Sequence, residues 1–143
     1  MSKTTTYLRD KWKDSLLTGQ AFSVPALYVG IFTTMPTTEA GDDGVEPTID
    51  PTTTGYARVL TTNKWQSGTG VGLTFENDEL FNFETLNVTW DGTTNPYSIA
   101  GIGLWDAPTG GNCLAYAVIN PTRVINVSQE MDIAPGGLIL NLE

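Results

Sequence analysis

The sequence lacks histidine altogether and contains a single cysteine among its 143 residues. Without histidine it cannot build a Ser-His-Asp triad, a Cys-His pair or an HExxH zinc site, and one cysteine cannot supply a CxxC site. Cys113 has no second cysteine with which to form an intrachain disulfide, so nothing points to an oxidising compartment. Most familiar hydrolase mechanisms are excluded, and we expect no enzymatic activity, no metal and no cofactor.

Long apolar runs are also missing. No stretch approaches the roughly 20 residues that cross a bilayer, and the first 20 residues lack the apolar segment of a signal peptide. We therefore expect a protein that is made in a cytoplasm and does not enter a membrane. Apolar residues make up 40% of the chain and aromatic residues 10%, which is typical of one globular domain of this length.

Basic residues are scarce and unevenly placed. The chain has 7 bases and 16 acids, and four of the bases lie within residues 1–13 beside one acid, which gives that segment a net charge of +3. The remaining residues carry three bases and fifteen acids, a net charge of −12. An acidic body disfavours nucleic acid as a partner. The basic end could meet an acidic protein surface, such as a neighbouring copy, or could simply keep a surface helix solvated.

One amphipathic helix is predicted over residues 5–18. Thr6 is a suitable N-cap, Leu8, Trp12 and Leu16 recur every fourth residue, and Gly19 follows where a left-handed residue ends helices. This apolar stripe must be buried either on the chain's own sheet or on a partner, and the sequence leaves both open. We accordingly divide the chain into a helical arm, residues 1–20, and a single β domain, residues 21–143.

The remainder of the chain has the pattern of short strands separated by turns. Seven to nine strands at this spacing predict a mainly β fold, a β-sandwich or barrel-like domain with the helix at its N-terminal end. The expected strands cover residues 27–34, 56–62, 71–75, 86–90, 97–105, 113–119, 123–127, 131–133 and 138–142. The first of these is apolar on both faces, which is typical of a central strand.

A long acidic connection is expected at residues 35–55. It contains five acids and no base, and at about 20 residues it exceeds the usual length of a structureless connection, so we expect it to contact another subunit. Its acids do not follow the spacing of a calcium loop. The candidate interface residues from the helix and this loop are Leu8, Trp12, Leu16, Glu39, Asp42, Asp43 and Glu46.

The sequence offers weaker support for two other functions, glycoside hydrolysis and sugar binding by stacking. Glu76, Asp78 and Glu79 could form the carboxylate pair of a glycosidase, but neighbouring acids occur in almost every acidic protein. The aromatic residues could form a platform for stacking sugars, although core packing explains most of them. Cys113 lies in an apolar strand and is expected to be a small buried hydrophobe.

Several motifs, taken in order, resemble a widespread group of small tailed-phage virion proteins. After the N-terminal Tyr7-Leu8 helix, they are Leu27–Thr34 with Pro36, then Gly55–Arg58, Ile102–Leu114 and Ala134–Leu140. The third is similar to the group's G-x-[FW]-D-A-x-T-G-G-N hairpin, and the fourth to its A-x-G-x-L-x-[IL] closing strand. The likeness extends over nearly the whole chain, and its specificity comes from the order and spacing of the motifs.

The resemblance implies a structural protein of the virion, made in the host bacterial cytoplasm, with no catalytic residues. Members of the group are described as tail-fibre-like, and similar proteins decorate capsids. The favoured interpretation is a capsid decoration, or cement, protein on the capsid surface that binds between major capsid protein subunits, as a homotrimer. The alternative is a tail fibre or baseplate component that recognises the host surface.

Overall fold

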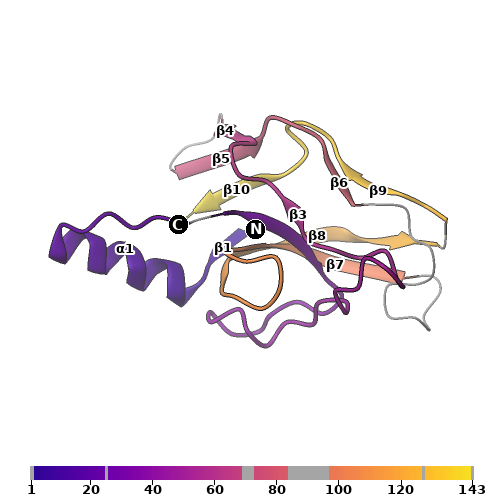
Figure 1. Ribbon diagram of the computed structural model, residues 1–143, viewed down its shortest axis with the longest axis horizontal. Coiled ribbons are helices and arrows are strands. Elements are labelled where there is room, and N and C mark those ends of the chain that lie inside the picture. Colours follow the sequence, from indigo (N-terminus) through magenta and orange to yellow (C-terminus); the bar gives the residue numbers. More distant parts are fainter. Residues whose placement is uncertain (1, 25, 69–72, 84–96, 127, 143) are drawn as a thin grey trace.

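The fold, seen in a computed structural model that describes residues 2–24, 26–68, 73–83, 97–126 and 128–142, consists of two β layers and one projecting helix (Figure 1). The first layer is a five-stranded antiparallel sheet with the strand order β1-β8-β7-β2-β3. Its strands are β1 (Ser2–Thr4), β8 (Cys113–Ile125), β7 (Tyr97–Trp105), β2 (Tyr28–Phe32) and β3 (Val59–Leu60). The helix, α1, spans Thr6–Thr18.

The second layer contains two smaller antiparallel sheets. One has the order β10-β5-β4, with β10 at Ile139–Leu142, β5 at Leu73–Asn77 and β4 at Trp65–Ser67. The other pairs β6 (Phe81–Phe83) with β9 (Met131–Ile133). The prediction of a mainly β protein with a single helix near the N-terminus is therefore confirmed for the described residues.

The main core lies between the two layers. Alternate residues of a strand point to opposite faces, so Phe81 and Phe83 are buried while Asn82 between them is exposed. Strand β2 differs, because all four residues from Val29 to Phe32 are buried. It lies between β7 and β3 with both faces covered, which confirms the predicted central strand.

A second apolar cluster lies on the opposite face of the five-stranded sheet. It contains Phe32, Trp105, Cys113 and Tyr116, and the rings of Phe32 and Trp105 are 5.1 Å apart between centroids. Gly103 allows this packing, because a Cβ atom there would lie 2.3 Å from the Trp105 ring. The cluster buries the Cys113 side chain to 7% exposure, as the sequence predicts.

The helix begins one residue earlier than its predicted cap implies. Thr5, and not Thr6, is the N-cap, and its side chain accepts a hydrogen bond from the Leu8 backbone N–H. Gly19 ends the helix in a left-handed conformation with φ of 70°, as predicted. In the part of the chain that the structure covers, no helix is long and apolar enough to span a bilayer.

Several strand boundaries differ from those predicted. Residues 113–119 and 123–127 were expected as two strands, whereas β8 is continuous through Pro121, which follows a cis peptide bond. Strands β4 and β6 lie outside the predicted strands, and β1 lies in the predicted arm. Strand β3 covers only two residues of the predicted 56–62. The predicted strand at 86–90 falls outside the described residues.

Candidate interaction site

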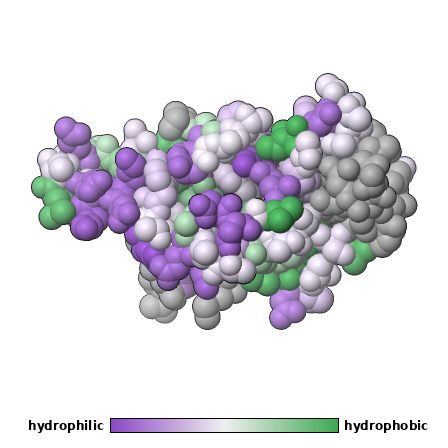
Figure 2. Space-filling model, turned by 90° about the horizontal axis from the view of Figure 1, so that it is seen from below, coloured by the Kyte–Doolittle hydropathy of each residue, from purple (hydrophilic) through white to green (hydrophobic). Residues whose placement is uncertain are grey.

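The apolar stripe of α1 is divided between the core and the surface. Leu8 is buried at 5% exposure and Trp12 is half-buried against the main core, whereas Leu16 is 87% exposed and Leu17 75% exposed. The helix projects from the body, and its C-terminal end is the part farthest from the sheets (Figure 1). Figure 2 shows apolar surface at that projecting end. We call Leu16 and Leu17 the helix tip.

Hydrogen bonds fix the start of α1 to strand β8. The Thr5 hydroxyl donates to the carbonyl of Cys113 at 2.7 Å, and the Thr5 N–H donates to the carbonyl of Leu114 at 2.9 Å. The Thr6 N–H donates to the carbonyl of Glu39 at 2.8 Å, which ties the helix to the acidic connection as well. Because its first turn is held on both sides, the helix has a defined direction in which to present its tip.

The acidic connection folds back over the second apolar cluster. The N–H of Thr33 donates to the carbonyl of Val45 at 2.8 Å, and Thr34 and Val45 form a β-bridge, so the segment between them closes into a loop. The Tyr116 hydroxyl donates to the carbonyl of Thr38 at 3.1 Å, which holds the middle of the loop on the sheet. The prediction that this connection contacts another subunit therefore omits its contact with the chain's own sheet.

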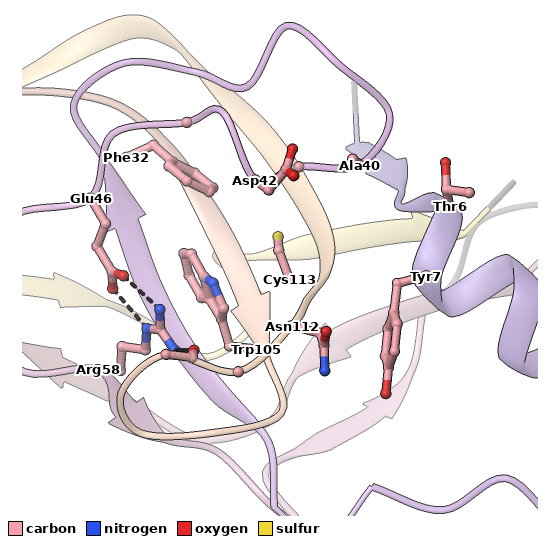
Figure 3. A pocket seen from close by; sticks show the side chains of 14 residues that line it. Thr6, Tyr7, Phe32, Ala40, Asp42, Glu46, Arg58, Trp105, Asn112 and Cys113 are labelled. Atoms are coloured by element: carbon pink, nitrogen blue, oxygen red, sulfur yellow. Dashed lines mark hydrogen bonds and ion pairs between the residues drawn. The ribbon is translucent and has the colours of Figure 1, made fainter.

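All four candidate acids have partners within the chain, and Asp42 accepts a bond of 3.5 Å from the Thr38 hydroxyl. Glu39 forms an ion pair with Arg9. Asp43 accepts hydrogen bonds from the hydroxyl and backbone N–H groups of Thr37 and Thr38, and these bonds, that from the Thr37 hydroxyl above all, hold its pKa far below the usual range. Glu46 forms an ion pair with Arg58. Asp42 is exposed at the rim of the pocket in Figure 3.

Glu46 and Arg58 form a nearly buried, two-pronged ion pair. The Arg58 Nε atom lies 2.8 Å from Glu46 Oε1, and the Arg58 Nη2 atom lies 2.6 Å from Glu46 Oε2 (Figure 3). The Arg58 side chain is 5% exposed and the Glu46 side chain 16% exposed. The Tyr56 hydroxyl also donates to Glu46 Oε1, at 2.7 Å. Burial, and then the nearby Glu46 charge, raise the pKa of Tyr56 well above its ordinary value.

The same guanidinium holds the hairpin between β7 and β8. Arg58 Nη1 donates to the carbonyls of Ala107 at 2.8 Å and Gly110 at 2.7 Å, and the group stacks 4.2 Å from the centre of the Trp105 ring. Arg58 lies in the Gly55–Arg58 motif, but nothing in the local sequence predicts this role for it. Its partner Glu46 lies 12 residues away, in a segment without bases, and no local pattern joins the two.

The pocket beside this ion pair has a volume of about 530 Å³ and is lined by both aromatic and polar side chains (Figure 3). Two of its polar groups are bound within the protein, since the Asn112 amide donates to Asp106 at 2.8 Å and the Arg58 guanidinium binds Glu46. Within the described ranges, no three His, Cys, Asp or Glu side chains are grouped so that they could hold a metal ion. These bonds hold the loops around the pocket together and so stabilise the fold.

A family profile described as "Podophage GP4 fiber I protein gp80" matches residues 3–141. The chain belongs to this family. No curated protein matches the chain. Membership in the GP4 fiber I family confirms the resemblance to small, tail-fibre-like virion proteins of tailed phages. The protein is therefore a structural component of a phage virion, where it associates with other virion proteins.

Two of the three acids considered for glycoside hydrolysis have separate structural partners in this fiber I family member. Glu76 accepts a hydrogen bond from Gln66 at 2.7 Å, and Glu79 lies 3.4 Å from the Lys64 ammonium. A structural fibre family favours the prediction that the protein is not an enzyme. The exposed residues of the predicted set are Leu16, Glu39, Asp42 and Asp43, and the three acids among them already have bonds within the chain.

The buried thiol gives a direct check of the second apolar cluster. Burial raises the pKa of Cys113 to about 12, so the thiol is protonated at pH 8 and shielded from reagents. We expect native protein to react with Ellman's reagent at least about 100-fold more slowly than protein unfolded in urea, because thiolate is the reactive form. Equal rates in the two states would contradict the packing of β8 described above.

Proposed function

We propose that this protein is a fibre-type subunit of a podophage virion and that the helix tip joins it to a neighbouring virion protein. The observation that carries the proposal is the tip itself, two leucines 87% and 75% exposed at the end of a helix whose first turn is firmly held. Isolated exposed leucines are common, but two adjacent ones on a projecting helix mark a surface suited to burial in a partner.

The size of this contact can be estimated. Burying a leucine side chain contributes about 1.5–3 kcal/mol, so the tip would contribute roughly 3–6 kcal/mol before the entropic cost of association. One such contact gives weak binding. Repeated around a symmetric assembly, it holds subunits firmly, since every further contact is then formed within one particle. This favours a protein present in several copies at one site of the virion.

Capsid decoration is the second candidate function. The projecting α1 that suits a fibre joint would equally suit insertion between major capsid protein subunits, with the homotrimer expected for a cement protein. The family name supports the fibre and the small acidic domain supports decoration, so copy number and position on the particle separate the two.

Electron cryomicroscopy of intact particles is the decisive measurement. Density at the tail, in a few copies, is expected for the fibre role, and antibody against the protein should then block adsorption to the host. Density at regular capsid positions would overturn the fibre proposal in favour of decoration. Absence of the protein from purified particles would contradict both candidates.

Substitution of the helix tip tests its role in attachment. The double variant Leu16→Asp, Leu17→Asp should fold as the wild type does, because both side chains are exposed, and should be incorporated into particles at least about tenfold less. Val124→Asp, at a residue 51% exposed on β8, is the matched control and should be incorporated normally. Normal incorporation of the tip variant would contradict the proposal.

A further inference from the structure

An apolar groove lies at the base of the helix, between α1 and the second layer. It has a volume of about 390 Å³, and its walls include Leu8, Trp12 and Phe22 on one side and Trp65, Phe75 and Leu140 on the other. Phe75 remains 37% exposed in this groove. A cavity of this volume, lined almost wholly by apolar side chains, is within the roughly 300–1,000 Å³ of binding sites and has room for leucine side chains.

The tip of the same chain cannot fill this groove. Leu16 lies eight residues after Leu8, which is about 12 Å along a rigid helix. Leu8 is fixed in the core at the groove's base, and the first turn of α1 is tied to β8 and to the acidic connection. A helix tip that enters the groove therefore comes from another molecule.

Charge favours a second copy of this chain as that molecule. The body carries a net charge of −12, and its three cations are engaged internally: Arg58 with Glu46, Lys64 with Glu79, and Arg123 with the carbonyl of Asp132. The strand that supplies Phe75 continues directly into the acids Glu76, Asp78 and Glu79. The basic residues of the chain are concentrated in its first 13 residues, which include the helix, so a neighbouring copy brings cations to this acidic surface.

We infer that the apolar groove of one copy receives the helix tip, Leu16 and Leu17, of the next copy. Lys13, one helical turn before Leu17, would then approach the acids that follow Phe75 in the receiving copy. This inference rests on the proposed function and adds that the neighbour joined by the tip is a second copy of the chain.

Such a contact is head-to-tail, because the tip and the groove are different surfaces of the chain. A head-to-tail contact closes into a ring or continues into a filament, depending on the rotation between copies. It also differs from a symmetric pairing of two helices in a way that can be tested. With separate surfaces, a chain damaged only in its tip can still bind a chain damaged only in its groove.

Sedimentation velocity of the purified full chain tests the inference with three variants. The tip variant is Leu16→Asp, Leu17→Asp, the groove variant is Phe75→Asp, and the control is Val124→Asp. We expect the wild type and the control to associate alike, and the tip and groove variants each to associate at least about 30-fold more weakly. A mixture of the tip and groove variants should form a one-to-one dimer, because one intact tip meets one intact groove.

Circular dichroism establishes first that each variant is folded. If Phe75→Asp is unfolded, chains carrying Leu16→Cys and Phe75→Cys are mixed under oxidising conditions instead, and a mixed disulfide dimer is expected. Three outcomes overturn the inference: a monomeric wild type, a folded groove variant that associates normally, or a mixture that does not pair in either experiment. A wild type that is monomeric yet present in virions would overturn this inference and leave the proposed function standing.

Discussion

Replacement of Arg58 with alanine is expected to lower the free energy of unfolding by about 3–5 kcal/mol, the usual cost of removing one partner from a buried ion pair. The variant leaves the Glu46 carboxylate, 16% exposed, without its cation, and leaves the carbonyls of Ala107 and Gly110 without their donor. It also removes the group that stacks on Trp105. Urea unfolding followed by tryptophan fluorescence measures the loss.

Two further variants show which part of the interaction matters. Arg58→Lys keeps the charge but cannot form the paired bonds to both oxygens of Glu46, so most of the loss should remain. The double variant Arg58→Met, Glu46→Gln removes both charges and should be more stable than Arg58→Ala, since no uncompensated charge is buried. A loss below about 1 kcal/mol for Arg58→Ala would show that the pair behaves as an exposed one.

Local patterns explain which strands could be predicted from the sequence. The bounds predicted for residues 97–105 and 131–133 coincide with β7 and β9, because each is an apolar segment ended by turn residues. Strands β1, β4 and β6 are not among the predicted strands. Each has only three residues, and each forms through pairing with another strand, β8, β5 and β9 respectively. Such pairing depends on residues far away in the sequence, so no local pattern reports it.

Local sequence patterns also fail to predict which residues of the candidate site are exposed. Leu8 and Leu16 are equivalent in the helical period, yet one is buried and the other exposed, because the helix extends past the sheet that covers its first two turns. Periodicity gives the apolar face but cannot show where the sheet ends. Glu46 was grouped with the exposed acids because no base lies near it in the sequence, while its partner Arg58 reaches it only in the folded chain.

Asn77 joins the two small sheets of the second layer through bonds of its amide group. This fully buried side chain donates to the carbonyls of Glu79 and Ala134, both at 2.8 Å, and accepts from the N–H of Leu138 at 2.8 Å. It connects the end of β5 with the turn between β9 and β10. The sequence gives no indication of this role, because the three bonded groups lie as far as 61 residues away.

Asn77→Ala is therefore expected to lower the free energy of unfolding by at least about 3 kcal/mol, because each of several buried backbone groups left without a partner costs about 1–3 kcal/mol. Asn82→Ala is the matched control: this asparagine lies in β6, is exposed, and its side-chain amide donates to the Asp132 carboxylate, so its loss should stay within about 1 kcal/mol. The urea midpoint should fall for Asn77→Ala with an unchanged slope, since the fold is retained. Equal midpoints for the two variants would show that the amide bonds of Asn77 do not hold the two sheets together.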